Sequence, residues 1–253
     1  MQDTGDHARL IEACDAVARD IECSMLSVRV ANTDLRELAV AALTSRSLEL
    51  YRASVHLVRL DMESAARVTL RSLLETVFRG VAVSRDDEAL ESYAMQEVRD
   101  RQRLVYAART SGTRMLEPLK GEAGDDVLST AERMLGPNPV RAFSTEDYAR
   151  RAGLHDWYAT AWRSFCWSAH ASPMDMTQYF VLNEEGQVTS LLITPPYTGS
   201  APLLATAALS MVYIGRAFDS LFGTNLGLVL DRYETQFAPY VEHPEEGREE
   251  ERA

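Results

Sequence analysis

Apolar side chains recur every three or four residues along most of the chain, the spacing that one face of an α-helix requires. This period predicts helices over residues 7–31, 35–60, 62–83, 88–111, 146–171 and 201–222, with a last helical stretch over 223–241. The clearest stripe, in the third helix, consists of Ala66, Leu70, Leu73, Leu74, Val77 and Val81. No alternation of strands with helices is visible. We therefore predict an all-α fold, a multi-helix bundle of about six long helices.

Breaks in the helical period mark connections and one insert. Glycines and prolines interrupt residues 112–145, which we interpret as an irregular excursion with a short helix over 125–135. Gly153 is expected to split the helix over 146–171, and a short helix should follow from Pro173 to about residue 182. The β-branched run QVTSLLIT and two prolines predict a short strand or hairpin insert near 187–198.

The composition is that of a globular protein. The chain has 253 residues, of which 46% are hydrophobic and 25% charged, and its formal net charge is −12. These values exclude a disordered chain, and the negative charge argues against a nucleic-acid coat protein, so no DNA partner is expected. Residues 1–243 are expected to form a single helical domain, and the acidic stretch 244–253 a disordered tail.

Cysteines and the N-terminal sequence indicate the compartment. Three scattered cysteines (Cys14, Cys23 and Cys166) suit neither a disulfide framework nor a zinc site, so we expect a reducing cytoplasm and no metal or cofactor. The polar start of the chain lacks the features of a signal peptide. Charged residues interrupt the apolar window over 203–222, which we interpret as a buried helix, so no membrane contact is expected.

The segment Arg163-Ser-Phe-Cys-Trp-Ser-Ala-His170 carries the candidate chemistry. Seven residues turn a helix through about 700°, so Arg163 and His170 lie within ~20° of one another, on a face that Cys166 and Trp167 share. A histidine at the C-terminal end of a helix is favoured in its cationic form, and beside an arginine it can hold a phosphate.

A structural role would explain the same residues. The loose pattern Arg-x(4–6)-His occurs twice, at Arg163–His170 and at Arg150–His155, which is about what chance predicts for an arginine-rich chain. By spacing alone, a structural histidine is the preferred interpretation. His56 lies on an otherwise apolar face of its helix and is expected to be a core residue.

A second candidate pair lies beside the core stripe of the third helix. Arg71 and Glu75 are four residues apart, so they can form an ion pair that fixes this helix against the helix over 146–171. The alternative is a catalytic carboxylate at Glu75.

Three segments together resemble a large bacterial family of uncharacterised helical proteins. They are AARVTLRSLLE at residues 65–75, the stretch from Tyr158 through Arg163 to Ser-Ala-His-Ala-Ser-Pro at 168–173, and a strand-like piece before a closing apolar helix. The family is marked by an RSLLE helix and a later helix end of the type S-x-x-H-x-S or H-P-S. It distantly resembles the HEPN superfamily (higher eukaryotes and prokaryotes nucleotide-binding).

The HEPN resemblance implies a catalytic pair and a dimer. HEPN ribonucleases carry Arg-x(4–6)-His on a bundle helix, which corresponds here to Arg163 and His170. We expect Arg71, Glu75 and Ser168 to support this pair. In such enzymes two protomers bring their pairs together. The histidine acts as general base or acid on the ribose 2′-OH and the leaving oxygen, the arginine steadies the phosphate, and no metal is needed.

Two functions follow. The first is a HEPN-like, metal-independent endoribonuclease of toxin or phage-defence type, which dimerises through the helix over 146–171 and takes RNA as its substrate. The alternative is a non-catalytic helical module that binds a protein or a small ligand, an interpretation that the acidic composition and the lack of any strong motif favour. An open position of His170 beside Arg163 would favour the first, and a sealed one the second.

Overall fold

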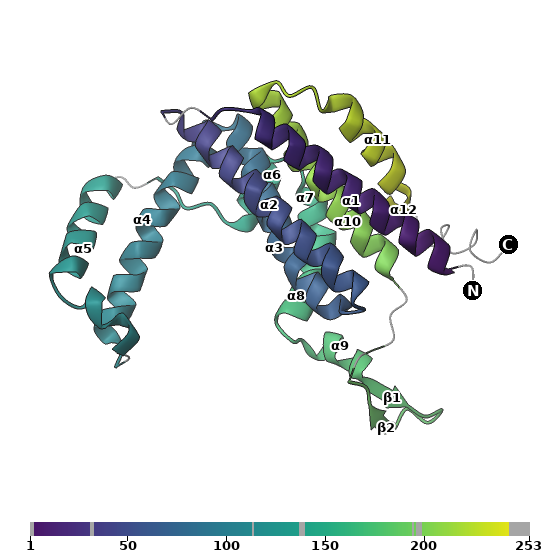
Figure 1. Cartoon of the computed structure of the whole chain (residues 1–253). Helices are drawn as coiled ribbons and strands as arrows, with labels where there is room; N and C mark the ends of the chain where they lie inside the picture. The colour runs from purple at the N-terminus through teal and green to yellow at the C-terminus, as the bar shows by residue number, and fades with distance from the viewer. Residues whose placement is uncertain are drawn as a thin grey trace.

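The computed structural model describes residues 3–30, 33–112, 114–136, 140–193, 195 and 199–242. Its five longest helices are α1 (Asp3–Ser27), α2 (Leu35–Arg59), α3 (Glu63–Arg85), α4 (Asp87–Thr110) and α10 (Ser200–Phe222) (Figure 1). The other described elements are η1 (Arg114–Leu119), α5 (Glu122–Leu135), α6 (Thr145–Arg151), α7 (His155–Trp157), the π-helix η2 (Tyr158–Trp162), α8 (Arg163–Ala169), α9 (Pro173–Met176), η3 (Thr177–Tyr179), β1 (Phe180–Leu182), β2 (Val188–Leu191), α11 (Gly227–Phe237) and α12 (Pro239–Glu242). The predicted all-α fold with a short strand insert is confirmed. The acidic tail predicted over 244–253 lies outside the described residues.

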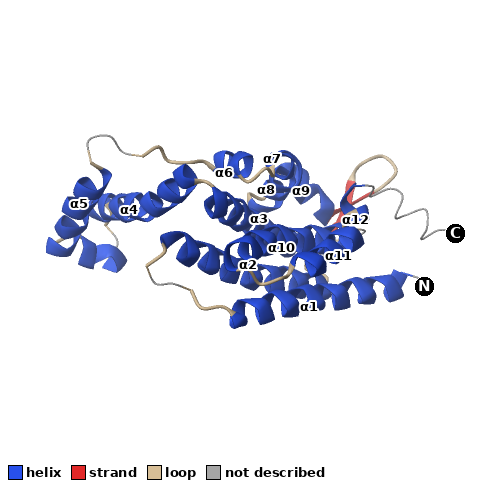
Figure 2. Ribbon diagram, turned by 90° about the horizontal axis from the view of Figure 1, so that it is seen from above, coloured by secondary structure: helices blue, strands red, loops and turns tan. Residues whose placement is uncertain are grey.

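Helices α2, α3 and α10 pack against one another at the centre of the bundle. Helices α1 and α11 pack on α10, while α6 and α8 pack on α3, as the view from above shows (Figure 2). The stripe predicted on α3 is buried at all six positions, because its spacing keeps every apolar side chain on the covered face. His56 is an exception to the predicted core, since its side chain is exposed on α2.

Helix α10 is apolar because it is enclosed by other helices. Among the described helices it alone is long and apolar enough to cross a membrane, and 78% of its most apolar window is buried inside the molecule. It packs closely on α3 at Gly80, where a Cβ atom would overlap Ile214 Cδ1 and lie 3.4 Å from Leu43 Cβ in α2. The close packing of α10 on α3 therefore depends on the missing side chain at this position.

Short polar side chains fix where several helices begin. Asp34 accepts hydrogen bonds from the backbone N–H groups of Arg36 and Glu37 at the start of α2, and Asp86 accepts one from Ala89 in α4. Ser144 and Asp147 form a reciprocal capping box at the start of α6. Each cap satisfies amide groups that the first helical turn leaves without intrahelical partners.

Helices α4 and α5 form an arm that projects from the bundle (Figure 1). The 14-residue α5 packs on the far part of α4, where Val105 and Ala108 are buried. The sequence predicted this helix as shorter, within an irregular excursion. A short amphipathic helix on a partner helix buries its apolar face as effectively as one in the bundle.

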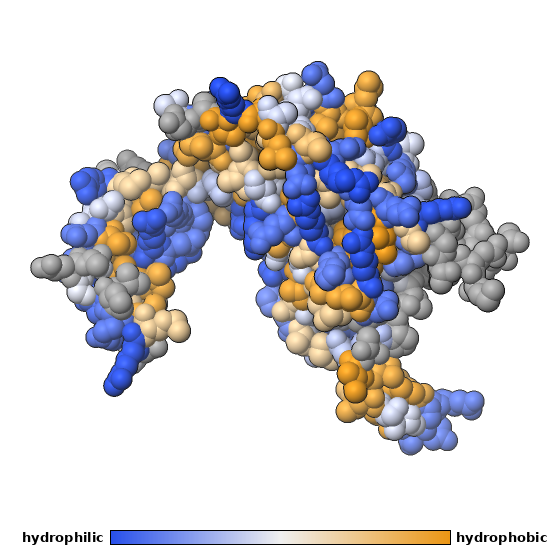
Figure 3. Space-filling model, viewed as in Figure 1, coloured by the Kyte–Doolittle hydropathy of each residue, from blue (hydrophilic) through white to orange (hydrophobic). Residues whose placement is uncertain are grey.

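The insert is an antiparallel hairpin whose first strand the sequence did not predict. Strand β1 pairs with β2 in the register Phe180↔Leu191, across a turn where Asn183 Oδ1 accepts hydrogen bonds from the N–H groups of Glu185 and Gln187. A helix was expected as far as residue 182, but it ends at Tyr179. Large apolar side chains stay exposed on the hairpin and just after it, up to 99% at Ile193, and they are conspicuous in orange in Figure 3.

Candidate functional site

The helical segment predicted over 146–171, with a break at Gly153, is divided into several pieces that orient Arg163 and His170. Gly153, with a φ of +67°, separates α6 from α7. The π-helix η2 then leads directly into α8, which begins at Arg163 and has His170 as its C-terminal cap. Single π-turns within α-helices frequently occur at functional sites. Both predicted catalytic residues therefore sit at the ends of a two-turn helix preceded by a π-turn.

Helix α8 turns Arg163, Trp167 and His170 to solvent. All three side chains are exposed, Trp167 to 49%, whereas Phe165 on the opposite side is buried and Cys166 is half-buried. At about 100° per residue, Trp167 lies ~40° from Arg163 around the helix axis. We call these three residues the α8 stripe. It presents two basic side chains and an indole ring on one open face.

Aromatic rings connect the α8 stripe to α3. The Arg163 guanidinium lies 5.4 Å from the centre of the Tyr158 ring, and Tyr158 stacks on Trp162 with ring centres 4.7 Å apart. The Arg71 guanidinium lies 5.2 Å from the centre of the Trp162 ring. Two arginines thus lie over two stacked rings, in contacts that are favourable because the ring faces carry negative potential.

Glu75 fixes the far end of this stack. One of its carboxylate oxygens accepts a hydrogen bond from Trp162 Nε1 at 3.1 Å and forms an ion pair with Arg71 at 3.1 Å. Both side chains of the ion pair are half-buried between α3 and the η2–α8 segment. Arg71 and Glu75 are therefore connected to Arg163 only indirectly, through the stacked rings of Trp162 and Tyr158. Within the described chain neither residue contacts Arg163 or His170 directly.

Ser168 lies on another side of α8. Its position is about 140° from Arg163 and ~160° from His170 around the helix axis. Its hydroxyl donates a hydrogen bond of 2.7 Å to Asp175 Oδ1, and Asp175 is buried in α9. Ser168 therefore holds α9 against α8 and does not contribute to the open face that carries Arg163 and His170.

Neither Tyr158 nor Trp162 was among the site residues predicted from the sequence. Both rings are only half-buried, and each carries an arginine. Their spacing of four residues, with an arginine directly after the second ring, is the signal that could have indicated a stack. Among the described residues no group of three or more His, Cys, Asp or Glu side chains is arranged to hold a metal ion.

Four charged residues at intervals of four lie along α3: Glu63, Arg67, Arg71 and Glu75. Glu63 is only 3% exposed, and its Oε2 atom has no hydrogen-bond partner in the described chain. Burial raises the pKa of this carboxyl above its ordinary value, although Arg67 one turn along opposes the shift. The Nε atoms of Arg67 and Arg71 are also buried without a described partner.

Glu63→Gln is expected to stabilise the protein by about 1 kcal/mol at pH 7, because a buried charged acceptor without a partner costs more than a neutral one. A folded-state pKa above the unfolded value of 4.5 means that the folded protein loses stability as pH rises through this range. The gain should therefore disappear below about pH 4, where both states bind the proton. Urea unfolding at pH 7 and pH 4 measures it, and an equal gain at both values would contradict this explanation.

Comparison with known proteins identifies a family without an assigned activity. The model described as "Family of unknown function (DUF5677)" matches residues 37–188, which is more than half of the chain and includes α3, the aromatic stack and α8. No curated protein and no solved structure matches the chain.

Proposed function

Because the chain belongs to the family of unknown function DUF5677, we propose its activity from the arrangement of its own residues. The protein is a metal-independent endoribonuclease in which Arg163 and His170 act on the RNA backbone. The observation that carries this proposal is the open α8 stripe, where a guanidinium and an imidazole flank an exposed indole ring. The resemblance of the Arg163–His170 pattern to HEPN ribonucleases points to the same chemistry, and to a toxin or phage-defence role in the cytoplasm.

The reaction needs one proton removed and one proton supplied. An imidazole nitrogen of His170 accepts the proton of the ribose 2′-OH, and the 2′-oxygen attacks the adjacent phosphorus. The bond from phosphorus to the 5′-oxygen breaks, and that oxygen takes a proton from a second imidazole. The products are a 2′,3′-cyclic phosphate and a free 5′-hydroxyl. Because one imidazole cannot give and take a proton in the same step, the proposal includes a dimer in which His170 of the partner subunit supplies the second group.

Arg163 and Trp167 have separate tasks in this scheme. The guanidinium forms paired hydrogen bonds to the phosphate and stabilises the charge that develops on its oxygens. The exposed ring of Trp167 offers a stacking surface for a base next to the scissile bond, a contact worth about 1–3 kcal/mol in other proteins. The stack of Tyr158 and Trp162 holds the Arg163 side chain at the edge of α8.

The test compares two histidines in the same pattern. Wild-type protein, His170→Ala and His155→Ala are incubated with end-labelled RNA in EDTA. We expect His170→Ala to lose at least about 100-fold in rate, the usual contribution of a general acid–base. His155→Ala is the matched control, because His155 belongs to the other Arg-x(4–6)-His pair and its Nε2 atom lies 3.3 Å from Glu146 Oε1, away from the α8 stripe. Similar rates for the three proteins would contradict the proposal, and sedimentation equilibrium tests the dimer.

A second candidate function is a non-catalytic module that binds a partner protein. The exposed apolar side chains of the β1–β2 hairpin favour it, since contiguous exposed apolar surface commonly marks an interaction site. In the same assay, absence of RNA cleavage by the wild type in EDTA would favour this second function.

A further inference from the structure

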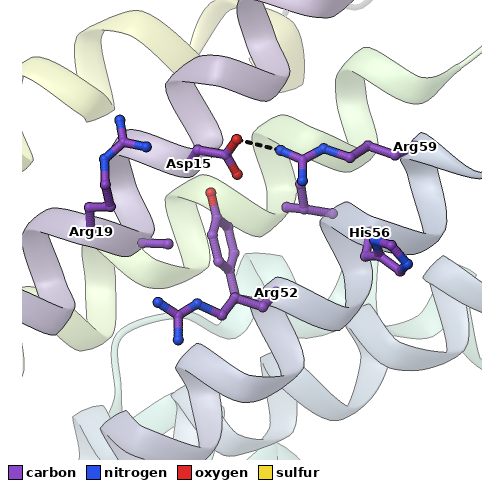
Figure 4. Close-up of a pocket in the computed structure, with 8 residues that line it drawn as sticks. Asp15, Arg19, Arg52, His56 and Arg59 are labelled. Atoms are coloured by element: carbon purple, nitrogen blue, oxygen red, sulfur yellow. Dashed lines mark hydrogen bonds and ion pairs between the residues drawn. The ribbon is translucent and has the colours of Figure 1, made fainter.

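A pocket of about 400 Å³ lies between α1 and α2, outside the site formed by α3 and α8. Figure 4 shows Asp15 and Arg19 reaching it from α1, and Arg52, His56 and Arg59 from α2. Its volume falls within the range of pockets that hold small molecules, about 300–1,000 Å³. The remaining lining residues are Ala18, Tyr51 and Val55.

The charge of this pocket is opposite to that of the whole chain. Three guanidinium groups line it against one carboxylate, that of Asp15, in a chain of net charge −12. Hydrophilic side chains also gather over α1 and α2 in Figure 3. A local concentration of positive charge within an acidic protein attracts anions to that place.

The polar group at the floor of the pocket, the hydroxyl of Tyr51, already has a hydrogen-bond partner within the protein. The Tyr51 hydroxyl is buried and donates a hydrogen bond of 2.7 Å to the carbonyl oxygen of Cys14. Burial raises the pKa of Tyr51, so this donor stays protonated. Ala18 and Val55 add buried apolar surface beside it. A ligand would therefore find its polar partners among the charged side chains at the opening.

The three arginines that line the pocket differ in whether they already form an ion pair within the protein. Arg59 is ion-paired to Asp15 at 2.5 Å, and Arg52 to Glu22 at 2.6 Å. Arg19 is exposed and has no ion pair within the described chain. A guanidinium has five N–H donors in a planar fork, so a paired arginine keeps donors for a second acceptor.

We propose that the α1–α2 pocket binds the phosphate group of a small phosphorylated molecule, through Arg19 with Arg52 and Arg59. The planar fork of arginine matches phosphate oxygens in pairs, and the apolar floor suits the uncharged part of such a molecule. Asp15 opposes binding, because its carboxylate occupies Arg59 and repels an anion. The proposal is independent of the endoribonuclease activity, since no lining residue belongs to α3 or α8.

Calorimetric titration with inorganic pyrophosphate, at constant ionic strength, tests the proposal. We expect saturable binding to the wild type and at least about 10-fold weaker binding to Arg19→Gln, since hydrogen bonds to charged groups are the strong ones. The matched control is Arg46→Gln, which removes the same charge from an exposed arginine of α2 that is paired to Glu49 and does not line the pocket. Its affinity should equal that of the wild type.

Asp15→Asn separates a binding site from a structural ion pair. Removing this carboxylate should tighten pyrophosphate binding several-fold, whereas loss of a merely structural contact would not. Melting curves by circular dichroism show that each variant is folded. Three results would overturn the proposal: no saturable binding to the wild type, equal weakening in Arg46→Gln and Arg19→Gln, or binding of an RNA oligonucleotide, but not of pyrophosphate, that depends on Arg19.

Discussion

Arg163→Ala is expected to lower the rate of RNA cleavage by about 10²–10³-fold, the usual effect of removing one group that stabilises the developing oxyanion. The fold should survive, because the Arg163 side chain is exposed and its described contact is the face of the Tyr158 ring. Initial rates in EDTA, with substrate above and below saturation, separate a loss of turnover from a loss of RNA binding.

Arg232→Ala is the matched control for Arg163→Ala. Arg232 is also exposed and lies over an aromatic ring, 5.9 Å from the centre of Tyr233 in α11. The Arg232→Ala substitution removes the same charge and the same kind of ring contact, but from α11, which does not contribute to the α8 stripe. Arg163→Lys should be intermediate, because lysine keeps the charge and loses the planar fork. An equal fall in rate for Arg163→Ala and Arg232→Ala would show that the loss of one positive charge causes the effect, and would contradict a specific role for Arg163.

Gly80→Ala is expected to destabilise the bundle by about 1–3 kcal/mol, the usual cost of overpacking a core. The new Cβ would overlap Ile214 Cδ1, so α10 or the isoleucine side chain must shift. The higher helix propensity of alanine offsets part of this loss, by up to about 1 kcal/mol. Urea unfolding measures the net change.

A double-mutant cycle with Ile214→Val identifies the clashing atom. Valine lacks the Cδ1 atom, and this substitution alone should cost about 0.5–1.5 kcal/mol. The double variant should then lose less stability than the sum of the two single variants. Gly227→Ala in α11 is the control, since its Cβ would lie 3.8 Å from Asp219 Oδ2, an ordinary contact. Strict additivity between Gly80→Ala and Ile214→Val would contradict the proposed overlap.

The sequence predicted the helices well where buried apolar residues recur at the helical spacing. The α3 stripe has the helical period, and the apolar α10 is enclosed by the bundle as expected. Strand β1 was missed because its three residues, Phe180–Leu182, are too few to show an alternating pattern. His56 was expected in the core, on an otherwise apolar face of its helix, but its side chain on α2 is exposed to solvent.

The candidate site was predictable only in part. The shared face of Arg163 and His170 follows from helical geometry, and the Arg71–Glu75 ion pair from their spacing. The two pairs are connected by the hydrogen bond from Trp162 to Glu75, two residues that lie 87 positions apart in the sequence. No local sequence pattern predicts a contact over that separation. The α1–α2 pocket depends likewise on how two helices align, so its arginines carried no signal in the sequence.

The π-helix η2 has a consequence for how this surface could have arisen. A π-turn accommodates one residue more than an α-turn, so an insertion or deletion there rotates the residues that follow it in the same helix, those of α8, by about 100°. Without the extra residue, the face of α8 that carries Arg163 and His170 would no longer point directly to solvent. A single codon gained or lost at Tyr158–Trp162 could thus expose or conceal the Arg163 and His170 side chains while the rest of the architecture stayed the same.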